Sequence, residues 1–300
     1  MSLWIPVTLA AAFFQTLRFM LQKHLSRVDL SPAGATFARF FYSAPLVAVL
    51  LALYLNASGQ ALPTLGLAFW IYGAAGGAAQ ILATICVVML FKQRNFAVGI
   101  TFKKTEVIQT VLVGWVILGE GVSIWGFAAI LIGLIGVLLL SDPPGGDGVW
   151  LRRIANRAAG IGLVSGVFFA ISGVCYRGAS LEIASADPLL RAGVTLSAVT
   201  AMQMVAMAIW LRLREAGEIT AVWRVRKVAG WIGLTSMAGS MCWFTAFTLQ
   251  TAAYVNALGQ VELIFSLLAS TLFFRETISR REIFGIAILA ISILMLILVI

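Results

Sequence analysis

Long apolar stretches alternate with short polar gaps along the whole chain. Ten such stretches can be delimited, at residues 4–22, 33–55, 66–91, 96–119, 122–140, 158–179, 188–211, 228–248, 252–274 and 282–300. Each is close to the ~20 residues that a helix needs to cross the ~30 Å hydrocarbon core of a bilayer. The pattern therefore predicts an all-α polytopic membrane protein with ten transmembrane helices.

The basic residues concentrate in alternate gaps between these stretches. Of the 21 lysines and arginines, 15 lie in or beside the odd-numbered gaps: Lys23, Arg27, Lys92, Arg94, Arg152, Arg153, Arg157, Arg212, Arg214, Arg224, Arg226, Lys227, Arg275, Arg280 and Arg281. Near the even-numbered gaps the only one is Arg177. Because cytoplasmic loops carry an excess of Lys and Arg, the bias predicts cytoplasmic odd gaps and, with ten spans, both termini outside.

Composition agrees with a membrane protein. Hydrophobic residues make up 61% of the chain and charged residues 11%, with a mean hydropathy of +1.00, whereas soluble domains have about 25% charged residues. The net charge of +9 comes from helix ends, so it does not indicate a nucleic-acid partner.

Cys86, Cys175 and Cys242 lie within predicted spans without metal-ligand spacing, and we expect no metal or other cofactor. Only Met1–Leu3 precede the first stretch, which we expect to be its own insertion signal rather than a cleaved peptide.

The chain contains two copies of one unit. Residues 96–140 align without gaps with residues 252–296, and this register pairs Glu106 with Glu262, Glu120 with Glu276, and Ser123 with Ser279. The matching glutamates are informative because the chain has only 12 acidic residues. We therefore predict a first five-helix repeat over residues 1–140, a Pro- and Gly-containing linker over 141–156, and a second five-helix repeat over 157–300.

Five spans in each half predict that the second half crosses the membrane in the opposite direction to the first. The charges agree, because the gap after Glu120 has no Lys or Arg whereas its counterpart after Glu276 carries Arg280 and Arg281. Inverted repeats of this kind are typical of secondary transporters, with the substrate site near the midplane between the halves.

The whole chain resembles the drug/metabolite transporter superfamily with paired EamA-type five-helix halves. The resemblance is carried by residues 105–140, TEVIQTVLVGWVILGEGVSIWGFAAILIGLIGVLLL, and by residues 261–298, VELIFSLLASTLFFRETISRREIFGIAILAISILMLIL. Glu120 and Glu276 match the glutamate that typically closes the fourth and ninth helices. Glu106-Val107 and Glu262-Leu263 stand where many members carry a proline. The resemblance implies a bacterial inner-membrane exporter of small metabolites, and it implies cytoplasmic termini, against the charge pattern.

Helix one carries a polar stripe. Gln15, Arg18 and Gln22 follow i, i+3, i+7 spacing and share one face, which is untenable next to lipid. The stripe lines a cavity or serves helix packing, and a guanidinium that needs a counter-charge or water favours the cavity. Glu262 is a candidate counter-charge for Arg18. Arg39, near the start of helix two, is either a further cavity residue or a side chain that snorkels to the headgroups.

The fourth and ninth stretches carry the other candidate site residues. Lys103 and Glu106 share a face, either as an internal salt bridge or as part of a ligand site. Lys104 points away from that face, to the interface or to another helix. On the ninth stretch, Asn256 and Gln260 are i, i+4 and suit structural hydrogen bonds or a site, whereas Glu262 is favoured as a substrate or proton site.

These residues favour a secondary transporter that works by alternating access. No Walker motif or GxGxxG occurs, so an ion gradient or the substrate gradient would drive it, and proton coupling and facilitated exchange are both open. The predicted spans hold four candidate site cations and two glutamates, which leaves an excess of two positive charges. The cations are Arg18, Arg39, Lys103 and Lys104, and the acids are Glu106 and Glu262. The excess predicts a carboxylate- or phosphate-bearing substrate, such as an amino acid or organic acid.

Three alternatives compete with this assignment. An exporter of lipophilic or cationic drugs would reverse the charge of the substrate, and a lipid flippase would need a lateral groove. An intramembrane enzyme is disfavoured, because the only histidine, His24, lies at a helix end and neither HExxH nor GxSxG occurs. Expected partners are the bilayer, a small molecule and, under coupling, protons. The small-residue run Gly73–Gly77 favours packing within a monomer, although a weak dimer is also open.

Overall fold

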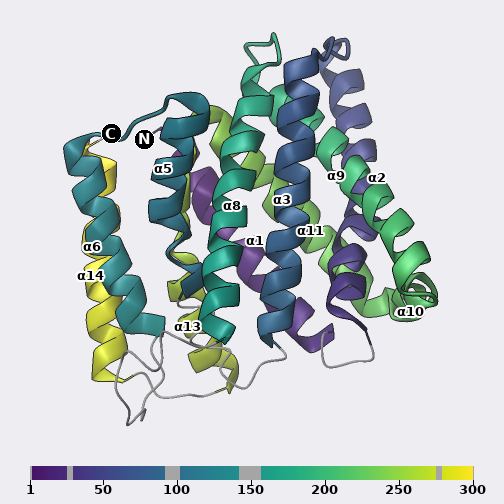
Figure 1. Cartoon of the computed structure of the whole chain (residues 1–300). Helices are drawn as coiled ribbons and strands as arrows, with labels where there is room; N and C mark the ends of the chain where they lie inside the picture. Colours follow the sequence, from purple (N-terminus) through teal and green to yellow (C-terminus); the bar gives the residue numbers. More distant parts are fainter. Residues whose placement is uncertain (1, 26–29, 92–101, 142–156, 275–278, 300) are drawn as a thin grey trace.

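The computed structural model describes residues 2–25, 30–91, 102–141, 157–274 and 279–299. These residues form helices and short connections (Figure 1). Seven helices are long and apolar enough to cross a membrane: α1 (Trp4–Leu25), α2 (Pro32–Ser58), α3 (Leu67–Phe91), α8 (Arg157–Leu181), α9 (Pro188–Arg214), α11 (Arg226–Leu249) and α14 (Arg280–Val299). The others are α5 (Glu106–Leu118), α6 (Ile124–Ser141), α10 (Glu218–Arg224), α12 (Ala252–Gly259) and α13 (Glu262–Phe274).

The chain is thus an all-helical, multi-pass membrane protein, as its hydrophobic pattern predicts. The count of ten continuous spans is not reproduced in the described residues, where three apolar segments are shorter than a full span: Glu106–Leu118, Ile124–Leu140 and Ala252–Leu268. Most of the expected linker and the whole of Glu276 lie outside the described residues.

Local sequence sets where the second spanning helix of each half begins, at α2 and at α9. Ser31 accepts a hydrogen bond from the Gly34 amide (2.9 Å) ahead of Pro32, and Asp187 caps the first amides of α9 ahead of Pro188. Proline suits the first helical position, since its missing N–H would have no partner there. The two starts are equivalent in the repeat register, so α2 and α9 begin with the same cap-and-proline chemistry in both halves.

The fourth and ninth predicted spans are both interrupted, at equivalent positions. Residues 104–105 and 260–261 form turns, and the helix that follows begins at Glu106 in α5 and at Glu262 in α13. The prediction of one uninterrupted helix over 252–274 was therefore wrong. Neither turn contains the proline that breaks helices by itself, so the apolar periodicity ran through the break unseen. The matched breaks place each glutamate in the first turn of a helix, where the positive end of the helix dipole stabilises a carboxylate.

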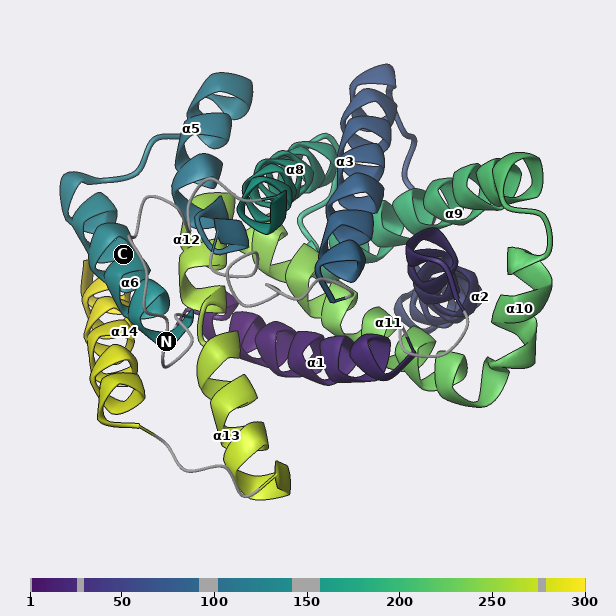
Figure 2. The same ribbon diagram turned by 60° about the horizontal axis from the view of Figure 1, so that its bottom comes forward.

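The two halves interlock instead of packing as separate bodies (Figures 1 and 2). Helix α3 of the first half packs on α8 of the second, and α11 of the second packs on α1 of the first. In the same way α5 packs on α8, while α12 and α13 pack on α1. Two further pairs are self-equivalent, α2 with α9 and α6 with α14. This exchange of partners is the one that a two-fold relation between inverted halves requires.

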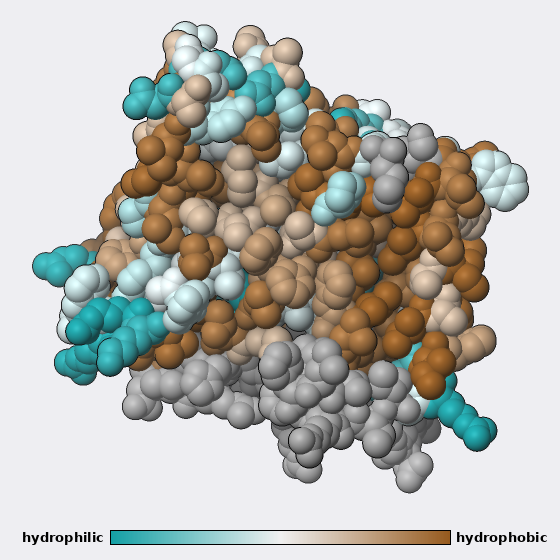
Figure 3. Space-filling model, turned by 180° about the vertical axis from the view of Figure 1, so that it is seen from behind, coloured by the Kyte–Doolittle hydropathy of each residue, from teal (hydrophilic) through white to brown (hydrophobic). Residues whose placement is uncertain are grey.

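Small residues allow the closest helix contacts. A Cβ added at Gly76 would lie 2.8 Å from the Tyr176 ring of α8, and one at Gly136 would lie 2.9 Å from the Leu289 backbone nitrogen of α14. Gly73 and Gly77 face α9, so the Gly73–Gly77 run packs within the monomer, as expected. Away from these contacts the helices present a broad apolar surface, with polar residues gathered toward its ends (Figure 3).

Both ends of the chain lie at one end of the bundle, and α10 lies at the other (Figure 1). The described basic residues that flank α10 include Arg214, Arg224 and Arg226, which are exposed. The termini and the most basic gap therefore lie on opposite sides of the apolar belt.

Candidate functional site

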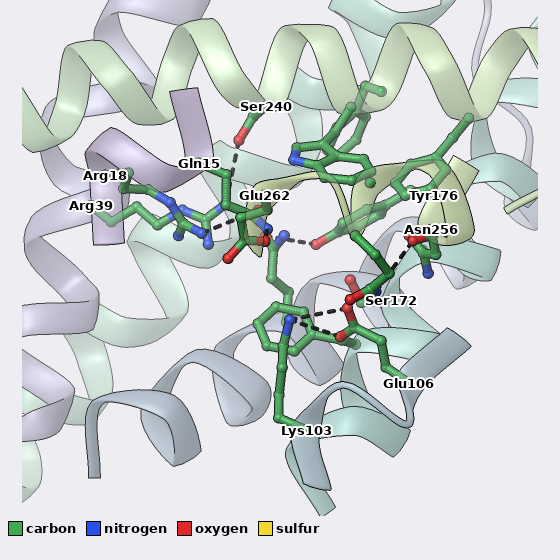
Figure 4. Close-up of a pocket in the computed structure, with 18 residues that line it drawn as sticks. Gln15, Arg18, Arg39, Lys103, Glu106, Ser172, Tyr176, Ser240, Asn256 and Glu262 are labelled. Carbon is green, nitrogen blue, oxygen red and sulfur yellow. Dashed lines mark hydrogen bonds and ion pairs between the residues drawn. The ribbon is translucent and has the colours of Figure 1, made fainter. Parts of the chain in front are cut away.

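A polar cavity of about 60 Å³ lies among eight helices of the two halves (Figure 4). The first half contributes Gln15, Arg18, Arg39, Gln80, Lys103 and Glu106, and the second contributes Phe169, Ser172, Gly173, Tyr176, Ser240, Trp243, Phe244, Phe247, Asn256, Gly259, Gln260 and Glu262. Eight of the nine residues expected at a site line this cavity. The exception is Gln22, which is fully buried on α1 and whose amide atoms have no hydrogen-bond partner within the described ranges.

Each interrupted span brings its glutamate to the cavity, and the segment just ahead of α5 supplies a lysine partner for both glutamates. Lys103 Nζ lies 3.0 Å from both carboxylate oxygens of Glu106 and 4.7 Å from the centre of the Phe169 ring. Lys104, which lies beside this cavity, has its Nζ 3.4 Å from Glu262 Oε2, and Gln15 donates a 2.8 Å hydrogen bond to the same oxygen. All four charged side chains are buried. Lys104 therefore meets another helix instead of snorkelling, and each carboxylate has one lysine as its counter-charge.

Two arginines form the other charged part of the cavity. Arg18 and Arg39 are 3% and 5% exposed, and their guanidinium groups lie side by side (Figure 4). Arg39 donates to the hydroxyls of Thr84 (3.4 Å) and Ser240 (3.3 Å), so it is a cavity residue and does not snorkel. Arg18 donates to Gln15 Oε1 at 3.4 Å, and its Nη1 has no partner in the part of the chain that the structure describes. The expected direct pair between Arg18 and Glu262 is replaced by a link through Gln15.

Aromatic side chains of α8 and α11 complete the wall. Tyr176 stacks on Phe244 with ring centres 4.4 Å apart, and Trp243 stacks on Phe247 at 5.7 Å. Gln203 donates to Tyr176 Oη (3.2 Å) and Tyr176 donates to Gln80 Oε1 (3.0 Å), which fixes the phenol. A single sequence gives no sign of which aromatic residues face inward, so Trp243 and Phe244 could not be assigned to the cavity before the fold was known.

The ninth span supplies polar groups through its interruption. Asn256 donates to Thr110 Oγ1 (3.0 Å), which joins α12 to α5, and Gln260 donates to the Asn256 carbonyl at 3.3 Å. A Cβ added at Gly259 would lie 2.3 Å from the Trp243 ring. Gly259 thus leaves room for the indole that lines the cavity.

Polar cavity residues that the sequence analysis missed come mostly from α3, α8 and α11. Gln80, Ser172, Tyr176 and Ser240 lie in apolar stretches where a single uncharged polar side chain carries little signal. Helical spacing relative to Arg18 or Arg39 could not have identified these residues, because the cavity is formed by contacts between the two halves of the chain. Arg191, in the first turn of α9, lies outside the cavity and donates to the Ser180 carbonyl at 2.7 Å.

One ion pair outside the cavity joins the halves at the even-gap end. Arg177 Nε lies 2.7 Å from both oxygens of Glu120, which follows the C-terminus of α5 as expected. Its Nη1 also donates to the carbonyls of Phe247 (2.7 Å) and Gln250 (2.8 Å) at the end of α11. Arg177, the one basic residue near an even gap, therefore fastens α5, α8 and α11 together.

The described residues contain no group of three or more histidine, cysteine or acidic side chains that could hold a metal ion. The site is a charged cavity between the two repeats. The first turns of α5 and α13, which follow the two interruptions, place Glu106 and Glu262 in its wall.

A family model described as the EamA-like transporter family matches the chain twice, at residues 2–142 and 156–298. The chain belongs to the EamA-like transporter family. This EamA-like protein is therefore a membrane transporter built from two repeats.

The fold is shared with a solved structure. A solved structure described only as the crystal structure of a protein superposes with a TM-score of 0.72, over 99% of this chain and 96% of its own. At 16% sequence identity the likeness shows a shared fold and nothing of the substrate. A search of curated proteins gives no significant match.

Proposed function

We propose that this EamA-like protein is a secondary transporter that moves a small organic anion across the membrane by alternating access. The observation that carries the proposal is the charge of the cavity. Arg18, Arg39, Lys103 and Lys104 are buried at the cavity or beside it, against Glu106 and Glu262. Buried cations without counter-charges are costly, so an anionic substrate would relieve them.

The interrupted helices support a transport cycle around this cavity. Helices broken near the midplane with half-helix ends at the ligand are a recurring device of transporters built from inverted repeats. We propose that the repeats 1–140 and 157–300, joined by the segment 141–156, rock against each other around the cavity. The substrate contacts would come from the eight cavity residues expected from the sequence, with Gln22 supporting α1.

Coupling to protons is part of the proposal and centres on Glu262. Its partners Gln15 and Lys104 come from other elements of the chain, so a rocking motion would change its surroundings in each cycle. Glu106 is held by Lys103 three residues away, a pair that moves as one unit. Glu262 is therefore the better candidate for a proton carrier, because its partners Gln15 and Lys104 would move away from the carboxylate during the cycle.

Export from the cytoplasm across a bacterial inner membrane, by a monomer or weak dimer, completes the proposed role. The test is to compare cells that express the wild-type chain with cells that express Glu262→Gln, profiling small molecules inside and outside by mass spectrometry. We expect one or a few carboxylate- or phosphate-bearing metabolites to accumulate outside only the wild-type cells. Equal profiles for all anions would contradict the proposal.

A second candidate is an exporter of lipophilic cations. The stacked pairs Tyr176–Phe244 and Trp243–Phe247, together with two carboxylates, are surfaces that attract organic cations. The excess of buried cations opposes it. A lipid flippase is less well supported, since the cavity is lined by eight helices, an arrangement that favours an enclosed path over a lateral groove.

A further inference from the structure

The two lysines and the two arginines at or beside the cavity differ in how their charges are balanced. Lys103 lies against Glu106 and Lys104 against Glu262, each within 3.4 Å, so these charges cancel in pairs. In the described part of the chain neither Arg18 nor Arg39 forms an ion pair. Their hydrogen-bond acceptors are the neutral groups of Gln15, Thr84 and Ser240.

The unbalanced charge is therefore localised at one place. The guanidinium groups of Arg18 and Arg39 lie beside each other at one end of the cavity, and both side chains are at least 95% buried (Figure 4). Two like charges in a poorly solvated space repel each other as well as losing hydration. One monoanion would leave one of these positive charges unbalanced.

Orphaned hydrogen-bond donors line the same cavity. Arg18 Nη1 and the indole Nε1 of Trp243 are buried, and among the described residues neither has an acceptor. Buried polar groups normally have hydrogen-bond partners, so each of these two donors can bind an acceptor atom of a ligand. The donors suit a ligand group with several oxygens, and guanidinium forks pair well with phosphate and carboxylate oxygens. The cavity of about 60 Å³ has room for about four to six water-sized spheres, enough for such a group.

We propose that Arg18 and Arg39 form a subsite for a doubly charged anionic group, a phosphate monoester in preference to a single carboxylate. This inference rests on the proposed function, organic-anion transport. It adds the charge of the group that the transporter recognises. Trp243 donates to the same group through its indole N–H, while Phe247 and Tyr176 contact the organic part. The paired lysines and glutamates contribute no net charge to the subsite.

The test uses probes that differ by one charge on the same ring. Binding of phenyl phosphate, methyl phenyl phosphate and benzoate to the purified full chain in detergent is measured by thermal shift and titration calorimetry. At pH 7.5 we expect phenyl phosphate to bind at least tenfold more tightly than the two monoanions. Because the second pKa of a phosphate monoester is about 6, its dianionic fraction falls about fourfold between pH 7.5 and 5.5. Its affinity should fall by a similar factor relative to methyl phenyl phosphate, whose charge stays constant and which corrects for protonation of the protein.

Matched arginine variants locate the subsite. Arg18→Gln and Arg39→Gln should each abolish the preference for phenyl phosphate, whereas Arg214→Gln, at an exposed position at the end of α9, should keep it. Without ligand, Arg18→Gln should melt no lower than the wild type, because it removes an unbalanced buried charge. Equal affinity for phenyl phosphate and methyl phenyl phosphate in the wild type would overturn the dianion subsite and leave organic-anion transport standing. A preference that survives both arginine variants would overturn the assignment to Arg18 and Arg39. Binding of a quaternary ammonium probe but of none of the anions would overturn the proposed function as well.

Discussion

Replacing Arg177 with methionine should lower the free energy of unfolding by about 2–3 kcal/mol. Arg177→Met removes two hydrogen bonds to Glu120 and two to the carbonyls of Phe247 and Gln250, all at 2.7–2.8 Å. The side chains of Arg177 and Glu120 are 12% and 21% exposed. Removing one partner of a buried pair costs about 3–5 kcal/mol, and an exposed pair contributes about 0–1 kcal/mol. This partly buried pair lies between these limits, nearer the buried one.

The assay is equilibrium unfolding by SDS in mixed micelles, followed by helix content. Glu120→Gln alone should cost less, about 1–2 kcal/mol, because Arg177 keeps both carbonyls. In the double variant Arg177→Met with Glu120→Gln, the loss should be smaller than the sum, with a coupling of at least about 0.5 kcal/mol. Arg214→Met serves as the control, since that side chain is exposed and its removal should stay within about 0.5 kcal/mol. If Arg177→Met unfolds with the wild-type free energy, Arg177 does not fasten the halves, and the reasoning from its geometry fails.

Three further outcomes are expected. Glu262→Gln should abolish coupled transport while Glu106→Gln retains part of it, measured as the pH dependence of flux in proteoliposomes; a normal rate with unchanged pH dependence for Glu262→Gln would remove the proton-carrier role. Fusions of alkaline phosphatase and green fluorescent protein to Ile300 should give an active phosphatase and no fluorescence, because the basic gaps are expected in the cytoplasm; a fluorescent, phosphatase-negative pair would reverse the orientation. Gly136→Val should lower stability by about 1–3 kcal/mol in the SDS titration, because the new side chain meets the backbone of α14 at Leu289. An unchanged midpoint for Gly136→Val would show that α6 and α14 separate at little cost.

The sequence by itself determined the membrane environment, the repeat and the family. Twenty-residue apolar stretches and basic gaps follow from the cost of placing peptide groups and charges in hydrocarbon, which acts on each segment separately. The matched glutamates Glu106 and Glu262 revealed the repeat because acids are rare in this chain. The polar stripe of Gln15 and Arg18 could be assigned to a protein-facing surface, since lipid cannot satisfy a guanidinium.

Only the tertiary structure decided how the charges are paired. Lys103 and Glu106 are neighbours on one helical face, so their contact was visible in the spacing. The contact between Lys104 and Glu262 joins segments from different halves, and no periodicity encodes it. The same holds for Arg39, which could snorkel or turn inward until its place beside Arg18 was known.

The interruptions of the fourth and ninth spans also depend on the folded whole. Their sequences lack proline, and their apolar periodicity passes through residues 104–105 and 260–261 without a signal. In the fold, Lys104 turns to Glu262 and Asn256 bonds to Thr110, so contacts with other helices accompany both breaks. The amides of Gln260 and Val261 still bond three residues back in the chain. The aromatic wall of Trp243 and Phe247 faces the cavity for a similar reason. Hydrophobicity places these side chains away from water, but only the packing of neighbouring helices decides whether they meet lipid, another helix or a ligand.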